Sequence, residues 1–101
     1  MSFDTVVHGG ALATATDVFK ADIGIRNGRI AAIADALEGG QRIDATGKYV
    51  LPGGIEAHCH IAQESAAGLM TADDYRTGSR SAALGGNTTI IPFAAQAQGE
   101  L

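Results

Sequence analysis

An Asn-Gly pair in the first third of the sequence is the feature that most restricts the fold. Asn27-Gly28 lies between two short runs in which apolar residues alternate with others, ADIGIR and RIAAIAD. A type I′ turn needs positive φ at both central positions, and Asn-Gly adopts this at the least steric cost. Ile23 and Ile25 fall on one face of the first run, as on a half-buried strand. The pattern therefore predicts a β-hairpin that turns at residues 27 and 28.

Short strands and turns are also predicted on both sides of this hairpin. DTVVHGG predicts a brief strand that ends at the glycine pair Gly9-Gly10. RIDATGKYVLPGG predicts another short strand, a turn at Gly47 and a further apolar run that Pro52 closes. No long helix is required in this half of the chain. We therefore predict a small β-rich unit over residues 1–53.

The pattern changes to strand, helix and strand over residues 54–101. IEAHCHI is the first strand, and NTTIIPFAAQ is a β-branched run without alternation, which is typical of a buried parallel strand. Between them, the Thr71 hydroxyl is predicted to accept the Asp74 amide and so to cap the helix ADDYRTGSRSAAL, which Gly85-Gly86 would end. This order predicts a right-handed β-α-β unit with parallel strands.

The overall composition restricts the class of protein. With 46% hydrophobic and 18% charged residues, the chain has the composition of a globular protein. A net charge of −4 offers no basic face for phosphates. No apolar run reaches the about 18 residues that cross a bilayer, and MSFDTVVHGG lacks the features of a signal peptide. Cys59 has no second cysteine to pair with. We therefore expect a cytoplasmic protein without nucleic-acid or membrane partners.

Two histidines in the strand IEAHCHI are the strongest candidates for chemistry. Because side chains alternate along a strand, Glu56, His58 and His60 share one face, whereas Cys59 points to the other. Cα atoms two residues apart on a strand are about 6–7 Å apart, so both imidazoles can converge on one zinc ion. The alternative is that they are ordinary strand residues. A position near the end of a first parallel strand, before a polar loop, favours the metal site.

Longer stretches around these histidines resemble a known enzyme family. YVLPGGIEAHCHI, followed by MTADDYRTGSRSAALGGNTTIIPF, is similar to the N-terminal part of the cyclic amidohydrolases, and most similar to the dihydropyrimidinase and hydantoinase group. The hairpin IGIRNGRIAAIA also matches the family's I-x-NGRI-x-x-I element. The resemblance is loose over residues 4–48 and close over 49–93. It implies an α/β protein with part of a β-sandwich domain over 1–53, followed over 54–101 by the first β-α-β unit of a metal-dependent hydrolase (β/α)8 (TIM) barrel.

The resemblance also implies an activity and a two-zinc centre. The complete protein would hydrolyse the C–N bond of a small cyclic amide or imide, such as a hydantoin or a dihydropyrimidine. His58 and His60 match the first-strand metal ligands of the family. A carboxylated lysine that bridges the metals, two more histidines and an aspartate base would lie outside this chain. No catalytic residue is therefore expected within the chain, and its substrate-binding residues stay unknown.

Two residues depart from the pattern of the family. Glu56 stands where an aspartate is usual; it keeps a carboxylate on the histidine face and is expected to accept a hydrogen bond from an imidazole or a neighbouring strand, in the second shell of the metal. Pro92 stands where an aspartate often follows the second apolar run, and it is expected to loosen or end the strand pairing. Leu69 and Met70 are expected either to line the barrel mouth or to pack.

The other polar residues of the β-rich half are not expected to form a site. His8 is predicted to be a surface or turn residue before its glycine pair. Asp4, Asp35, Asp44 and Lys48 are predicted to be solvated. None of them is expected to replace the metal ligands that the chain lacks.

Two alternative functions belong to other classes. A non-catalytic family relative would act in assembly, but such relatives have lost the ligands that this chain keeps. An independent 101-residue product would act only as an oligomerisation or interaction module. Because a (β/α)8 barrel takes about 250 residues, we expect the chain to be an N-terminal fragment of a homo-oligomeric enzyme, and to be inactive by itself.

Overall fold

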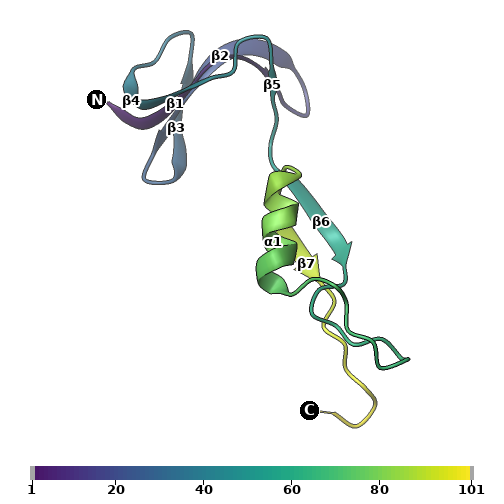
Figure 1. The fold of residues 1–101 in the computed structure, drawn as a ribbon. Helices are drawn as coiled ribbons and strands as arrows, with labels where there is room; N and C mark the ends of the chain where they lie inside the picture. Colours follow the sequence, from purple (N-terminus) through teal and green to yellow (C-terminus); the bar gives the residue numbers. More distant parts are fainter. Residues whose placement is uncertain (1, 101) are drawn as a thin grey trace. The chain divides into compact units, whose positions relative to one another are not determined.

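The chain divides into two units, Met1–Pro52 and Gly53–Leu101, each with its own sheet (Figure 1). The computed structural model describes residues 2–100. The first unit, called the β unit below, consists of strands and turns. The second, called the β-α-β unit, holds two strands and a helix. Among residues 2–100, no helix combines the length and the apolar character that a bilayer crossing requires.

One five-stranded sheet forms the β unit. Its strands are β1 (Phe3–Ala13), β2 (Val18–Arg26), β3 (Arg29–Ala34), β4 (Gly39–Asp44) and β5 (Tyr49–Val50). The spatial order is β3-β2-β1-β4, and β5 pairs with the later part of β1. The β1–β2 and β2–β3 pairs are antiparallel, whereas β4 and β5 run parallel to β1.

The predicted hairpin is confirmed. It joins β2 to β3, and both turn residues have positive φ, 52° for Asn27 and 70° for Gly28. The exposed side chain of Asp4 also holds the turn, because its carboxylate accepts the backbone N–H of Asn27 at 2.6 Å. The turn is thus fixed by its own sequence and by a contact from β1.

The first strand is longer than predicted. It does not end at the glycine pair but continues to Ala13, with an irregular register between Val7 and Gly10. Gly9 has a φ of +71°, a conformation that glycine adopts without strain. A Cβ atom on Gly10 would lie 2.5 Å from Cγ2 of Val50. The pair therefore provides a bulge and a close approach to β5 rather than a strand end.

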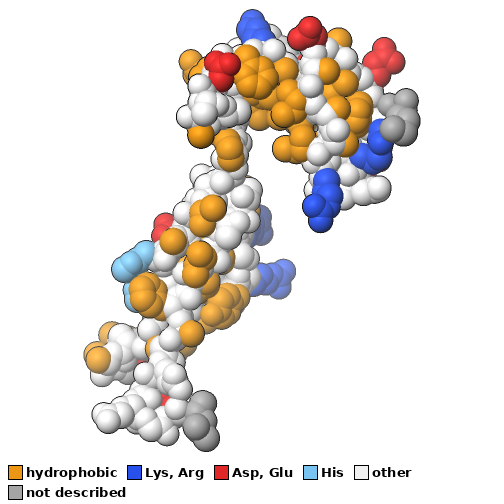
Figure 2. All heavy atoms as spheres, turned by 180° about the vertical axis from the view of Figure 1, so that it is seen from behind, with side chains coloured by type: hydrophobic (Ala, Val, Ile, Leu, Met, Phe, Trp, Pro, Cys, Tyr) orange, Lys and Arg blue, Asp and Glu red, His pale blue; other side chains and the backbone are white. Residues whose placement is uncertain are grey.

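The core of the β unit is small and centres on β1 and β2. Leu12, Ala21 and Ile23 form its buried cluster, and Val50 packs against it. Burying each large aliphatic side chain stabilises the fold by about 1.5–3 kcal/mol. Other apolar side chains stay accessible, and Figure 2 shows hydrophobic atoms gathered on one face of this unit.

The β-α-β unit has the predicted order. Its elements are β6 (Gly54–Cys59), α1 (Tyr75–Leu84) and β7 (Asn87–Pro92), and β6 pairs with β7 in parallel. Figure 1 shows α1 alongside β7, which it contacts. Gly78 is buried, and a Cβ atom there would lie 3.0 Å from Cδ1 of Ile61. The small residue therefore lets the helix lie close to the chain that follows β6. β7 ends at Pro92, as predicted.

The helix begins later than predicted, and its cap is a different residue. Asp74 is the N-cap: its Oδ1 accepts the N–H of Thr77 at 2.8 Å, and the Thr77 hydroxyl accepts the N–H of Asp74 at 3.1 Å. The Thr77 amide holds the pKa of Asp74 below its ordinary value. Thr71, the predicted cap, instead accepts the N–H of Gln63 at 3.1 Å. The prediction was wrong because two candidate caps stand within four residues, and the loop uses the first of them.

Candidate metal centre

The two predicted ligands lie side by side at the carboxyl end of β6. His58 belongs to the strand, and His60 directly follows its last residue, Cys59. Their ring centroids are 5.7 Å apart, with an angle of 68° between the ring planes. Both side chains are exposed, whereas Cys59 is half-buried. The neighbouring imidazoles can therefore face one ion, although metal binding itself stays a prediction.

An aromatic ring from the second strand contacts both histidines. Phe93 stacks on His60 with a centroid distance of 4.5 Å and an angle of 2°, and it meets His58 edge-on at 4.7 Å. It follows β7, and its N–H donates to the carbonyl of Cys59 at 3.0 Å. Sequence reasoning missed this residue. The signal was available, because parallel pairing aligns the carboxyl ends of the two strands.

His60 also has a polar partner in the loop that follows it. Its Nδ1 lies 2.7 Å from Oε1 of Gln63. The Gln63 backbone is tied to Thr71, which donates its N–H to the Gln63 carbonyl at 2.9 Å and accepts the Gln63 N–H through its hydroxyl. Ala62 donates to the carbonyl of Asp73 at 2.9 Å. Hydrogen bonds thus join the loop to the segment before α1, and they hold the backbone of Gln63 in place.

Glu56 lies on the histidine side of β6, as alternation predicts, but its hydrogen bond is to the backbone. Its Oε1 accepts the N–H of His58 at 2.8 Å. This bond joins residues two apart on one strand, so the carboxylate stays close to the histidine backbone. The predicted role of Glu56 beside the metal ligands stays a prediction.

The donor atoms of this site fit zinc but do not complete its shell. Neutral imidazole is a common zinc ligand, and structural and catalytic sites take four or more ligands in total. Within residues 2–100, no group of three or more His, Cys, Asp or Glu side chains is arranged to hold a metal ion. His58 and His60 would therefore supply two ligands of a centre whose other ligands come from elsewhere.

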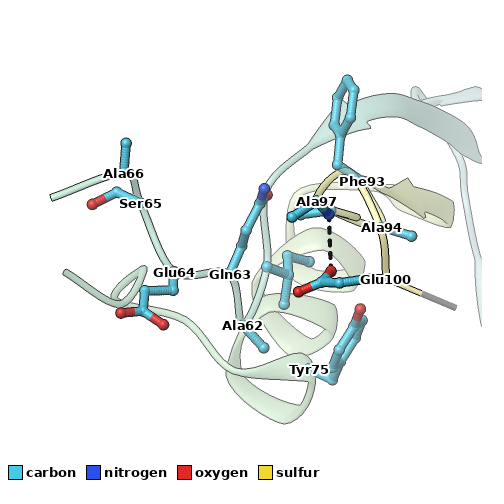
Figure 3. A pocket seen from close by; sticks show the side chains of 12 residues that line it. Ala62, Gln63, Glu64, Ser65, Ala66, Tyr75, Phe93, Ala94, Ala97 and Glu100 are labelled. Carbon is cyan, nitrogen blue, oxygen red and sulfur yellow. Dashed lines mark hydrogen bonds between the residues drawn. The ribbon is translucent and has the colours of Figure 1, made fainter. Parts of the chain in front are cut away.

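A cavity of about 550 Å³ lies in the β-α-β unit, and two residues that contact His60, Gln63 and Phe93, are among those that line it (Figure 3). It is lined by the first loop residues after His60, by Tyr75, by Phe93 and by residues near the end of the chain. Glu100 closes part of it, with its carboxylate accepting the N–H of Ala97 at 2.8 Å. Leu69 and Met70 are not among its lining residues; they are 70% and 62% exposed, so they pack against little of the described chain.

Comparison with known proteins gives closely similar relatives. A D-hydantoinase of Streptomyces coelicolor is 44% identical over 98% of this chain and 22% of its own length. A D-hydantoinase of Geobacillus stearothermophilus is 44% identical over 94% of this chain and 20% of its own length. A crystal structure of D-hydantoinase matches with a TM-score of 0.90 and 43% identity, over 95% of this chain and 21% of that one. The chain is similar to the N-terminal portion of the cyclic amidohydrolases.

The predicted resemblance to the hydantoinase and dihydropyrimidinase group is therefore confirmed. Proteins named allantoinase and dihydropyrimidinase match this amidohydrolase-like chain as well. No family model matches it. The chain spans about a fifth of the length of the curated relatives it matches.

The third histidine of the chain, His8, contacts a buried carboxylate in the β unit. His8 Nδ1 lies 3.0 Å from the carboxylate of Asp22, whose residue is 1% exposed. The carboxylate also accepts the N–H groups of Gly9 at 2.9 Å and Leu37 at 3.1 Å. The hydrogen bond from His8, followed by that from Gly9, lowers the pKa of Asp22 to about 2, against the opposing effect of burial.

His8 was predicted to be a surface or turn residue, and the structure bears this out only in part. It lies within β1, and its side chain is 35% exposed. The sequence signal was the carboxylate of Asp22, which interrupts the apolar run ADIGI and needs a partner if it is buried. Because its oxygens accept from His8, Gly9 and Leu37, Asp22 serves the structure of the β unit and not a metal.

Proposed function

We propose that this chain is the N-terminal part of a metal-dependent cyclic amidohydrolase. Residues 1–53 would belong to a small β-sandwich domain, and residues 54–101 would begin a (β/α)8 barrel. The complete, homo-oligomeric protein would open the ring of a hydantoin, a dihydropyrimidine or a cyclic imide by hydrolysis of its C–N bond. The observation that carries the proposal is the close pair His58 and His60 at the end of a parallel strand. The pair lies in a chain of which 95% matches a D-hydantoinase structure.

In this proposal the chain supplies two of the protein ligands of a two-zinc centre. His58 and His60 present imidazole nitrogens from one end of β6, while Glu56 accepts the N–H of His58. Phe93 places an apolar ring against both imidazoles, parallel to His60 and edge-on to His58. Zinc, when bound, lowers the pKa of coordinated water to about 7 and polarises a carbonyl. The bridging carboxylated lysine, the remaining histidines and the aspartate base would come from outside this chain.

Zinc binding by the 101-residue chain tests the ligand assignment. Two imidazoles supply half of a tetrahedral shell, so weak binding is expected, and replacing both His58 and His60 with alanine should abolish it. His8→Ala is the matched control, because His8 pairs with Asp22 in the other unit. Competition with a chromophoric chelator measures the affinity. Equal zinc affinity in the wild type and the double variant would contradict the assignment.

Ring opening tests the activity. The chain by itself should not hydrolyse hydantoin or dihydrouracil, because within residues 2–100 we identify no positioned base and at most part of the metal shell. A longer product that contains this chain should hydrolyse at least one of them, and replacement of His58 and His60 should abolish the reaction. Turnover by the 101-residue chain above the uncatalysed rate would contradict the proposal that the base and the remaining metal ligands lie outside it.

A second candidate function is an oligomerisation module without catalysis. Large apolar side chains on both strands of the β-α-β unit favour association, since Ile55 is 67% and Ile91 is 55% exposed. Sedimentation of the 101-residue chain distinguishes the two. Self-association without zinc binding would support the module, whereas zinc binding lost with the two histidines supports the amidohydrolase.

A further inference from the structure

We propose that Gln63 is a positioning residue of the metal site: it holds His60 as the Nδ1–H tautomer, so that Nε2 is the atom that binds the ion. This inference rests on the function proposed above and adds a residue that the sequence pattern did not single out. It starts from the 2.7 Å contact between Nδ1 of His60 and Oε1 of Gln63.

The tautomer follows from the chemistry of a neutral imidazole. Such a ring has one N–H and one nitrogen with a free lone pair. Nδ1 of His60 is occupied by Gln63 at hydrogen-bond distance, so an ion has access only to Nε2. Nε2 can bind an ion only when it carries no proton, so the proton must be on Nδ1. Nδ1–H then donates to the carbonyl oxygen of the Gln63 side chain. A metal-bound histidine ordinarily donates its other N–H in this way.

The ring of His60 is held in two independent ways. Phe93 lies parallel to it at 4.5 Å and restricts the tilt of the ring plane. Gln63 restricts rotation within that plane, because it fixes the direction of one nitrogen. Thr71 in turn holds the Gln63 backbone by bonds in both directions. Because the backbone of Gln63 is held by Thr71, its side chain can keep a constant direction toward His60, which a positioning role requires.

Histidine nitrogen NMR on the metal-free chain tests the tautomer directly. In alkaline buffer, where the imidazoles are neutral, the wild type should show His60 mainly as the Nδ1–H form. Gln63→Met removes the acceptor while keeping a chain of similar length, and the Nδ1–H form should lose its majority. Gln63→Glu restores an acceptor and should restore that form. Gln41→Met, at an exposed position on β4 in the other unit, is the matched control and should change nothing.

The same variants, titrated with zinc alone, test the consequence for the metal. Loss of a partner that orients a ligand costs about tenfold or more in metal affinity, so Gln63→Met should bind zinc about tenfold more weakly, and Gln63→Glu at least as tightly as the wild type. Backbone amide spectra confirm that each variant keeps the fold. A wild-type His60 protonated mainly at Nε2, or an unchanged tautomer in Gln63→Met, would overturn the inference.

The outcomes also separate this inference from the proposed function. Zinc binding that is lost in His58→Ala but unchanged in Gln63→Met would overturn the positioning role and leave the metal site standing. A wild-type chain that binds no zinc would overturn the proposed metal site, and with it the role of Gln63. Nδ1–H in the wild type, together with weaker zinc binding in Gln63→Met, supports both.

Discussion

Replacing Asp22 with asparagine should destabilise the β unit, because the buried carboxylate joins three parts of it. It accepts from the His8 ring and the Gly9 amide of β1, and from the Leu37 amide between β3 and β4. An asparagine has one oxygen and an NH₂ group, so at least one of these donors would face another donor. A buried donor left without an acceptor costs about 1–3 kcal/mol.

The direction of the pKa shift of Asp22 agrees with this cost. The pKa of Asp22 falls from its ordinary 3.8 to about 2, and each unit of pKa corresponds to about 1.4 kcal/mol of preference for the charged form. The ionised carboxylate therefore stabilises the folded unit by about 2 kcal/mol relative to its protonated form. We therefore expect Asp22→Asn, which removes this charge, to lose about 2 kcal/mol of stability.

The pH dependence follows in sign from the direction of the shift. Because the folded-state pKa lies below the unfolded value, the unfolded chain binds the proton more readily. The stabilisation from Asp22 is complete above pH 3.8 and is lost as the pH falls toward about 2. The wild type should therefore lose more stability than Asp22→Asn over this interval, and the two should converge at its acidic end.

Urea unfolding followed by the amide NMR signals of β1 and β2 measures the free energy of unfolding of this unit. Asp35→Asn is the control, since it makes the same change of charge at an exposed position of the β unit. Asp22→Asn should be about 2 kcal/mol less stable than this control at neutral pH. If the two variants agree to within about 0.5 kcal/mol, the size of a typical surface substitution, the buried pair does not hold the unit together.

Three further substitutions test the local structure. Gly10→Ala should lower the free energy of unfolding in urea by about 1–3 kcal/mol, because its Cβ would lie 2.5 Å from Cγ2 of Val50. Adding Val50→Ala should recover part of this loss, and no recovery would contradict the packing of these two residues. Gly28→Ala should cost about 1 kcal/mol through its φ of 70° alone, since no neighbour lies within 4 Å of its Cβ position; an equally stable variant would show that the turn is not type I′. Asp74→Ala should remove the N-cap of α1 and cost about 1 kcal/mol, seen as lower helix content by circular dichroism, and unchanged helix content would argue against the capping box.

The elements that could be predicted were those specified by local chemistry. Asn27-Gly28 determines the hairpin turn by its own steric preference, so neighbours were not needed to place it. The parallel β-α-β order followed from the apolar run before Pro92 and from the helix between the strands. These features depend on residues close together in the sequence.

The features that were missed depend on contacts between distant residues. β1 continues past its glycine pair because residues 10–13 pair with β2, which no local pattern shows. His8 pairs with Asp22 fourteen positions away, and only the β1–β2 pairing places them together. The helix cap could not be predicted because two residues could serve. The Thr71 hydroxyl accepts the N–H of Gln63 in the loop, and Asp74 caps α1 instead.

The same distinction applies to the candidate metal site. Strand alternation puts His58 and His60 on one face, so their proximity could be predicted from the spacing alone. The groups that orient His60 could not, because Gln63 is positioned by the loop and Phe93 by the end of the partner strand. His60 is therefore restrained in plane and in rotation before any ion binds, whereas the ring of His58 meets Phe93 and His60 only edge-on. An ion that reaches this chain would find His60 already oriented by Gln63 and Phe93.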